Sequence, residues 1–236
     1  MQRYFVHGNL ENIIFNEQDL FHIEKVMRNK VGDEIEIVLD SKAYLVAIDS
    51  FKPFKVHIVN PILKETETPY PITLFFPLTK SDKAELVIQK ATEIGVHRII
   101  FYRAIRSVVK LDEEGFNKKK VRYESIAKEA AEQCHRLLIP NIVGVINFND
   151  IKSYLSKHNL LAFEMDAGRT SSLHEELDNV SGDVSIIVGP EGGFDNKEIS
   201  YLDDIGFHHV SLGKRILRCE TAAIYALSVI SSYMER

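Results

Sequence analysis

The chain has 236 residues, of which 45% are hydrophobic and 27% are charged. This composition is typical of a globular protein and provides enough chain for one large domain or two smaller ones. No apolar run approaches the roughly 18 residues that a membrane helix needs, and the segment MQRYFVHGNLENIIF lacks the features of a signal peptide. The two cysteines, Cys134 and Cys219, match neither a disulfide framework nor a zinc spacing. We therefore expect a cytoplasmic protein without a metal site.

The net charge of −5 is distributed unevenly along the chain. Residues 71–136 contain 13 basic and 9 acidic residues, a net charge of +4. The flanking segments 1–70 and 137–236 have net charges of −3 and −6. An acidic protein with a basic segment can bind a polyanion through that segment, although a solvated helix surface explains the same composition.

The first part of the chain predicts a small β-barrel. The runs RYFV, EIEIVL, AYLVAI and FKVHIV are short, closely spaced and rich in strand-forming residues. One helix is expected near Glu17–Met27, capped by Asn16. Its predicted inward-facing residues are Leu20, Phe21, Ile23, Val26 and Met27.

A linker separates this region from the rest of the chain. The segment PILKETETPYP contains three prolines and shows no apolar periodicity. We therefore predict a domain boundary after residue 70, with domains 1–70 and 71–236.

The second domain alternates predicted strands with predicted helices. This alternation favours an α/β fold with a parallel sheet and crossover helices. Ser81 is the expected cap of the first helix, and Asp195 with Glu198 has the spacing of a capping box. The predicted strands are ITLFFPL, RIIFYR, NIVGVI, LLAFEM, VSIIV and HHVSL, and a long apolar helix TAAIYALSVISSYMER closes the chain.

A glycine-rich turn follows the buried strand VSIIV. The sequence VGPEGGF places Gly189, Gly192 and Gly193 where α/β proteins often bind ligands. It lacks the Gly-Lys-Ser/Thr of a P-loop and the GxGxxG of a dinucleotide site. Glu191 would repel a phosphate, so a neutral or cationic ligand fits better. A purely structural turn is equally consistent with these residues alone.

Two further strands end in similar turns. HHVSLGKRILRCETA places Gly213 after a strand, and LLAFEMDAGRT places Gly168 after another. The apolar residues Ile216 and Leu217 inside the charged connection of the first turn indicate a folded loop. Adjacent strand ends with small residues predict one pocket at the carboxyl edge of the sheet.

Together, VGPEGGF and SLGKRILRCETA resemble the signature of the RsmE-type enzymes, the 16S ribosomal RNA uridine-N3 methyltransferases of the SPOUT superfamily. The resemblance extends over nearly the whole chain. RYFV and HIEKVMRNKVGDEI are similar to the PUA-like RNA-binding domain of that family, and LTKSDKAELVIQKATEIGV, RSVVK and EAAEQCHRLLIP are similar to its catalytic domain. Cys219 and Cys134 depart from the residues expected at their positions.

The resemblance implies a SPOUT-type α/β sheet with a C-terminal trefoil knot and an N-terminal PUA-like β-barrel. It implies a homodimer that binds S-adenosylmethionine and methylates N3 of one uridine in 16S rRNA of the small ribosomal subunit. The knot loops would be 163–169, 188–193 and 211–221. The implied cofactor-binding residues are Phe163, Glu164, Val188, Gly189, Pro190, Glu191, Gly192, Gly193, Ser211, Leu212, Gly213, Ile216, Leu217, Arg218, Thr221 and Ala222.

Methyl transfer to N3 requires that a proton leave the uridine. A cation beside the base would stabilise the resulting anion, and Arg136 is the first candidate, with Arg218 and Arg106 as alternatives. Glu220 is a candidate base, although it would equally well bind backbone N–H groups. The residues predicted to contact RNA are Arg28, Lys80, Lys83, Arg103, Arg106 and Lys110.

Two other functions remain open from the sequence. A non-catalytic ribosome-assembly factor would use only the small barrel and the basic surface. An α/β enzyme for another nucleotide would use the same glycine turns. Methyl transfer to small-subunit RNA excludes the first alternative, and a ligand screen in which ATP or NAD stabilises the protein would favour the second.

Overall fold

The structure is a computed structural model that describes residues 1–107, 109, 111–163, 171–178 and 180–236. Its contacts divide the chain into two units. The first comprises Met1–Glu67 with Ala131–Leu138, and the second comprises Thr68–Ala130 with Ile139–Arg236. The sequence-based boundary after residue 70 assigned 131–138 to the second domain. The structure places this segment in the first unit, where His135 is hydrogen-bonded to Glu36 and Arg136 is ion-paired with Glu67.

The first unit is built mainly from β-strands. β1 runs parallel to β4, while β4–β5 and β5–β6 are antiparallel pairs. A separate antiparallel pair, β2–β3, was missed in the sequence because each strand has only three residues. The described strands form an open sheet and a hairpin, so the closed barrel stays a prediction. The bounds are β1 Arg3–Phe5, β2 His7–Asn9, β3 Asn12–Ile14, β4 Glu34–Leu39, β5 Lys42–Phe51 and β6 Phe54–Ile62.

The predicted helix of this unit is split into α1 (Glu17–Phe21) and a π-helical turn η1 (His22–Val26). The Asn16 cap is confirmed, because its Oδ1 accepts a hydrogen bond from the N–H of Asp19 at 2.7 Å. Among the predicted inward-facing residues, Ile23 is fully buried. The inward assignment was wrong for Phe21, Val26 and Met27, which are 62%, 57% and 47% exposed. The wider π turn shifts the residues after Ile23 off the apolar stripe of an α-helix.

The second unit contains a seven-stranded sheet, as the alternating pattern predicted. Its strand order is β11-β13-β10-β12-β7-β8-β9, and every described pair is parallel. The α/β class with a parallel sheet is therefore confirmed. The bounds are β7 Ile72–Pro77, β8 Arg98–Arg103, β9 Asn141–Asn147, β10 His158–Phe163, β11 Ser171–Ser172, β12 Val184–Val188 and β13 His208–Ser211.

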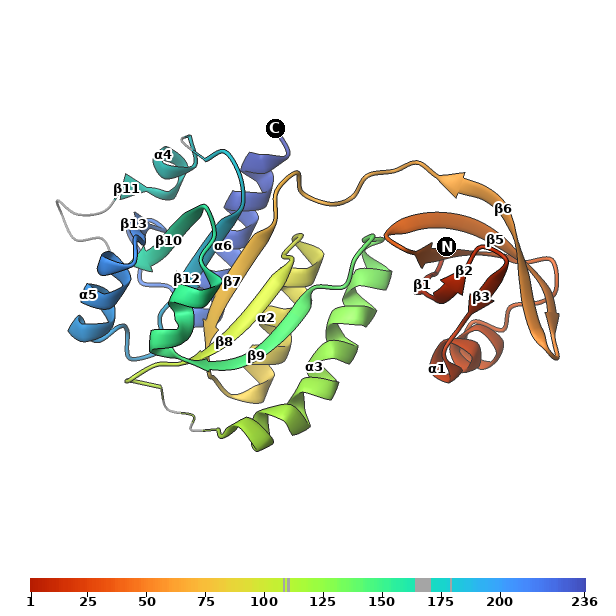
Figure 1. Ribbon diagram of the computed structural model, residues 1–236, viewed down its shortest axis with the longest axis horizontal. Helices are drawn as coiled ribbons and strands as arrows, with labels where there is room; N and C mark the ends of the chain where they lie inside the picture. Colours follow the sequence, from red (N-terminus) through yellow and green to blue (C-terminus); the bar gives the residue numbers. More distant parts are fainter. Residues whose placement is uncertain (108, 110, 164–170, 179) are drawn as a thin grey trace. The chain divides into compact units, whose positions relative to one another are not determined.

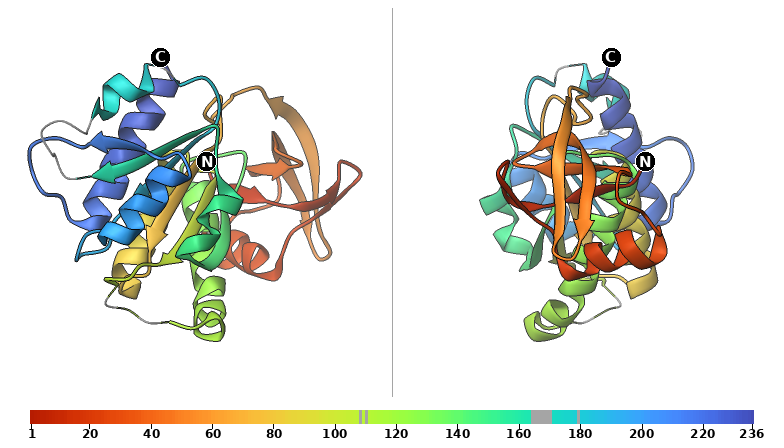
Figure 2. Two further views of the ribbon diagram at one scale, coloured as in Figure 1. Left: turned by 60° about the vertical axis from the view of Figure 1, so that its left-hand side comes forward. Right: turned by 90° about the vertical axis from the view of Figure 1, so that its right-hand side faces the viewer.

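Helices cover both faces of this sheet (Figures 1 and 2). The larger apolar cluster joins one face to α2, α3, α4 and α6, and a second cluster joins the other face to α5 and η2. Alternate residues of β7 divide between them, with Leu74 in the first cluster and Phe75 in the second. The bounds are α2 Ser81–Glu93, α3 Glu113–Gln133, the 3-10 helix η2 Phe148–Tyr154, α4 Leu173–Leu177, α5 Asn196–Asp204 and α6 Cys219–Met234.

The two predicted helix caps of this unit had different outcomes. The capping box of Asp195 and Glu198 at α5 is confirmed. The Ser81 cap was wrong, because Ser81 already lies in the first turn of α2 and Lys80 occupies the extended cap position. Lys80 makes no side-chain capping bond, so the start of α2 lacks that stabilisation.

Within the described ranges, no helix has the length and apolar character needed to cross a membrane. The same residues contain no cluster of three histidine, cysteine or acidic side chains arranged to hold a metal ion.

Candidate cofactor pocket

A cavity of about 960 Å³ lies at the carboxyl ends of β10, β12 and β13. Its volume is within the range of pockets that hold small molecules and cofactors. The pocket lies at the Gly189 and Gly213 turns, where the sequence predicted it, whereas the third predicted turn, at Gly168, lies outside the described residues. It is lined by Lys83, Arg106, Ala162, Val188, Gly189, Pro190, Glu191, Gly192, Gly193, Phe194, Leu212, Gly213, Lys214, Arg215, Ile216, Leu217, Arg218, Cys219 and Ala222.

The turn after β12 requires glycine at two positions. A Cβ on Gly189 would lie 3.0 Å from the ring of Phe194, which is itself buried in the second apolar cluster. Gly193 has φ +68° and donates its N–H to the carbonyl of Pro190 at 2.9 Å. Glycine at these positions therefore keeps the turn tight and its backbone open to a ligand.

Tyr102 and Arg106 fix this turn from the neighbouring strand β8 and the loop after it. The buried Tyr102 hydroxyl donates to the carbonyl of Val188 at 2.6 Å. Burial raises the pKa of Tyr102 well above its ordinary value, so the hydroxyl remains a donor. Arg106 donates to the carbonyl of Gly192 at 3.3 Å and pairs with Asp195 at 3.2 Å.

The acidic cap of α5 connects the same two loops. The Glu198 carboxylate accepts from the N–H of Ile105 and from the N–H of Asp195, each at 2.8 Å. The N–H of Lys197 and, beyond it, Arg106 hold the pKa of Asp195 below its ordinary value. The end of β12 is therefore anchored by hydrogen bonds from several directions.

A cluster of three charges lies at the pocket, where Lys83 and Glu191 line the wall and Glu220 lies beside it in α6. Lys83 Nζ, from the first turn of α2, is 3.0 Å from Glu191 Oε1 and 3.4 Å from Glu220 Oε2. The hydrogen bond to Glu191 raises the pKa of Lys83. Burial alone would raise the pKa of Glu191, but the hydrogen bond from Lys83, a backbone hydrogen bond and the charges of Lys83 and Lys80 together outweigh burial, and the pKa is lowered. The cluster therefore contains one cation and two carboxylates, and the paired Glu191 is held in its charged form.

Cys219 lines the pocket as a neutral thiol. Burial, followed by the nearby carboxylates Glu191 and Glu220, raises its pKa far above the ordinary value. A thiol that retains its proton is a poor nucleophile. Cys219 therefore acts as a small buried side chain.

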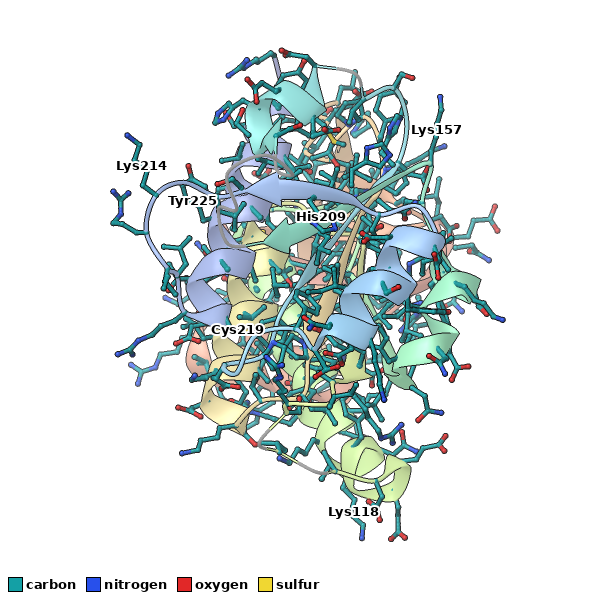
Figure 3. The ribbon with its side chains drawn as sticks, turned by 90° about the vertical axis from the view of Figure 1, so that its left-hand side faces the viewer. Lys118, Lys157, His209, Lys214, Cys219 and Tyr225 are labelled. Atoms are coloured by element: carbon teal, nitrogen blue, oxygen red, sulfur yellow. The ribbon has the colours of Figure 1, made fainter. Side chains whose placement is uncertain are left out.

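The loop between β13 and α6 forms the more exposed wall. Ile216 is 82% exposed, and Lys214, Arg215 and Arg218 are exposed as well. Figure 3 shows Lys214 extending away from the sheet, whereas Cys219 lies further in at the start of α6. The prediction that Ile216 packs inside a folded loop was wrong, because its side chain faces solvent.

Most of the predicted cofactor residues lie together in this pocket. Two of them do not line it: Ser211 is buried at the end of β13, and Thr221 is exposed on α6. Glu164 lies outside the described residues, as does the side chain of Phe163.

The three catalytic candidates lie in different surroundings. Arg218 lines the pocket at the cap of α6. Glu220 follows it in the first turn of α6 and pairs with Lys83. Arg136 belongs to the first unit, is 2% exposed and forms hydrogen bonds with Glu67. This ion pair gives Arg136 a structural role, and its catalytic role stays a prediction.

The predicted RNA-contact residues are also dispersed. Lys83 and Arg106 line the pocket and are both ion-paired. Lys80 is exposed beside them, and Arg103 donates to Asn147 Oδ1 at 3.2 Å. Arg28 is exposed in the first unit with φ +56°. Lys110 lies outside the described residues.

Several lining residues were not predicted to bind the cofactor. Phe194, Lys214 and Arg215 lie inside the two glycine-turn motifs, so taking every residue of each motif would have found them. Lys83 and Arg106 come from distant segments, and only the folded structure brings them to these turns. The remaining additions are Ala162 and Cys219.

Comparison with known proteins identifies the family. The family described as RNA methyltransferase domain matches residues 66–231, which include all the pocket residues. The chain belongs to this family. It is 33% identical to the ribosomal RNA small subunit methyltransferase E of Bacillus subtilis, with 100% of this chain and 98% of that protein covered. It is 36% identical to the protein of the same name from Mesomycoplasma hyopneumoniae, covering 97% and 98%.

A solved structure extends this similarity to the fold. The ribosomal RNA small subunit methyltransferase E of Neisseria gonorrhoeae, bound to S-adenosylmethionine, has a TM-score of 0.84 and 26% identity. The match covers 98% of this chain and 97% of that one. The family membership inferred from the glycine-turn motifs is thereby confirmed.

Proposed function

We propose that this protein methylates N3 of one uridine in 16S rRNA, the nucleotide conventionally numbered 1498, with S-adenosylmethionine as the methyl donor. The observation that carries the proposal is the pocket at the strand ends inside the RNA methyltransferase domain. The names of the full-length relatives support a small-subunit rRNA substrate.

The pocket residues fit S-adenosylmethionine. This cofactor carries a sulfonium cation and has no phosphate, and the wall offers carboxylates and open glycine backbone instead of a P-loop. Glu191 lines this wall, and Glu220, whose buried Oε2 lies 3.4 Å from the Lys83 ammonium, lies beside it. No atom lies within 4 Å of where a Cβ on Gly193 would be, so the backbone there is open to a ligand. When bound, the cofactor supplies an activated methyl group on its cationic sulfur.

The protein would contribute mainly by positioning the reactants. Orientation of two reactants in one site can lower a barrier by roughly 7–11 kcal/mol. Hydrogen bonds and an ion pair join the loop after β8 to the turn after β12. Together these two segments would orient the bound cofactor. Arg218, at the pocket and without an ion-pair partner among the described residues, would stabilise the negative charge that develops on the uracil as its N3 proton leaves.

The strand order supports the proposed SPOUT knot. Phe163 at the end of β10 and Ser172 in β11 pair with Ser211 from opposite sides of β13. β13, the last strand in the chain, therefore lies between two strands that precede it in the sequence. This order supports the knot that we propose.

The proposal includes a homodimer and a PUA-like first unit that binds RNA in the cytoplasm. Exposed apolar residues on the second unit, such as Leu86 on α2 and Tyr225 on α6, support a self-associating surface. Light scattering of the purified protein tests the dimer, and a monomer at micromolar concentration would contradict it.

The function is tested by methyl transfer with an isotope-labelled methyl donor. Small subunits from cells that lack this protein are incubated with the purified protein, and the 16S rRNA is digested for mass spectrometry. We expect labelled 3-methyluridine at a single position. Methylation of another base, or no methylation of either naked RNA or assembled subunits, would contradict the proposal.

A further inference from the structure

Lys83 connects the two walls of the pocket. Its ammonium lies 3.0 Å from Glu191, on the turn after β12, and 3.4 Å from Glu220, in the first turn of α6. Lys83 itself belongs to a third element, α2, which packs against α6. One cation therefore joins three segments that are distant in the sequence.

The surroundings make this cluster stronger than a typical surface ion pair. The side chain of Glu220 is 13% exposed and that of Lys83 is 24% exposed. Glu220 Oε2 has no hydrogen-bond partner, so the nearby ammonium is its main compensation among the described residues. By contrast, the helical pair Lys118–Glu114 is 74% and 79% exposed, and pairs of that kind contribute little. A carboxylate that loses its counter-ion in a partly buried place is strongly destabilised.

The same geometry argues against a phosphate contact by Lys83. An ammonium group has three donors and attracts anions, but two carboxylates already lie beside this one. A phosphate at Lys83 would approach a cluster whose net charge is negative. The sequence-based prediction of an RNA contact suits the exposed Lys80, whose ammonium has no hydrogen bond or ion pair with the described residues.

We propose that Lys83 is a positioning residue that joins the turn after β12 to the start of α6 and so holds the cofactor pocket in its binding shape. The inference rests on the proposed function for the identity of the cofactor. Loss of the ammonium would let the two carboxylates repel each other and move the walls apart. The pocket would then bind its cofactor more weakly, while RNA contacts elsewhere would be unchanged.

The experiment compares two lysines close together on the chain. Lys83→Met and Lys80→Met are titrated calorimetrically with S-adenosylmethionine, and their affinity for a 16S rRNA fragment is measured over a range of salt concentrations. We expect Lys83→Met to bind the cofactor about 10-fold or more weakly, within the effect of removing one partner of a partly buried pair. The slope of the logarithm of its RNA affinity against the logarithm of the salt concentration (the salt slope) should equal that of the unmodified protein.

The control should give the reverse pattern. Lys80→Met should keep its cofactor affinity within about twofold, and its salt slope for RNA should fall by about 0.7–0.9, the value for one lost phosphate contact. Unchanged cofactor affinity in Lys83→Met, together with a reduced salt slope, would overturn the proposal and support a phosphate contact instead.

Two further variants separate positioning from a general loss of folding. Lys83→Arg should recover most of the affinity, because a guanidinium can bridge two carboxylates. The double variant Lys83→Met with Glu220→Gln should bind better than Lys83→Met alone, since the repulsion between the two carboxylates is removed. If neither variant recovers affinity, the positioning role is wrong.

Hydrogen exchange on the free protein separates this proposal from the proposed function. Lys83→Met should exchange faster than the unmodified protein at residues 189–193 and at 219–222, and Lys80→Met should not. This outcome would support the positioning role even if the protein bound no S-adenosylmethionine. Unchanged exchange in both segments would contradict it.

Discussion

The two loops that line the pocket differ in how firmly they are held. The turn after β12 receives hydrogen bonds from Tyr102 and Arg106 and an ion pair from Lys83. The described side chains of the loop between β13 and α6 form hydrogen bonds only between Ser211 and Gly213, and the loop carries the exposed Ile216. One wall is therefore formed before any ligand binds, whereas the other can adjust when a ligand arrives.

This difference suits a site that must hold a cofactor and admit a large second substrate. A preformed wall reduces the entropy lost when the cofactor binds. The exposed loop places Lys214, Arg215 and Arg218 at the pocket mouth, and none has an ion-pair partner among the described residues. Unpaired cations beside an exposed apolar side chain are suited to nucleic acid, whose phosphates and bases require both.

Replacing Gly189 with valine should have the largest effect on the formed wall. Its Cβ would lie 3.0 Å from the Phe194 ring, which is packed in the core and cannot easily move. We expect the affinity for S-adenosylmethionine to fall by about 100-fold or more, equivalent to about 2.7 kcal/mol, as measured by calorimetry. Lys214→Ala is the control on the adjustable wall, because its side chain is exposed at the pocket mouth. Equal losses of affinity in both variants would contradict the difference between the walls.

Tyr102→Phe should weaken the fold by removing one anchor of the formed wall. The change leaves the carbonyl of Val188 without its 2.6 Å hydrogen bond in a buried place. We expect the free energy of unfolding to fall by about 1–3 kcal/mol in urea denaturation. Tyr225→Phe, at a position 43% exposed, should change it by less than about 0.5 kcal/mol. No difference between the two variants would mean that the Tyr102 hydroxyl does not anchor β12.

Neutralising the adjustable wall should affect RNA more than cofactor. The double variant Lys214→Gln with Arg215→Gln should reduce the salt slope of RNA binding by about 1.4–1.8, the value for two phosphate contacts. Its affinity for S-adenosylmethionine should stay within about threefold of that of the unmodified protein, because the formed wall, the turn after β12, is intact. An unchanged salt slope would remove this loop from the RNA-binding surface.

Acidification should loosen the formed wall by a small amount. The pKa values of Glu191 and Asp195 are below their ordinary values of 4.5 and 3.8. Their stabilising effect is therefore complete above those ordinary values and is lost as the pH falls through the lowered ones. Urea denaturation between pH 6 and pH 3 should show a shallower loss of stability in Glu191→Gln than in the unmodified protein. Identical pH profiles would show that this ion pair does not contribute to stability.

The sequence predicted the parts of the site that are local in the chain. The strand-turn pattern located the Gly189 and Gly213 turns, because the carboxyl ends of parallel strands share one edge of a sheet. It also gave the Asp195 cap, which depends on residues three apart. These features need no knowledge of how distant segments meet.

Contacts between segments that are distant in the chain could not be predicted from the sequence. The pairing of Lys83 with Glu191, and of Arg106 with Asp195, depends on the packing of helices and loops against the folded sheet. From the charge of the sequence alone, Lys83 and Arg106 were both predicted to contact RNA. The exposure of Ile216 was missed for a related reason, since apolar character does not reveal whether a loop has a surface to pack against.

Hydrogen exchange with and without S-adenosylmethionine tests the central claim most directly. The account predicts that the cofactor adds strong protection to the backbone of residues 212–218 and little to residues 189–193, which the anchors already protect. It also predicts no change across residues 1–60. Absence of added protection at both loops, or a change confined to residues 1–60, would contradict both the pocket and the difference between its walls.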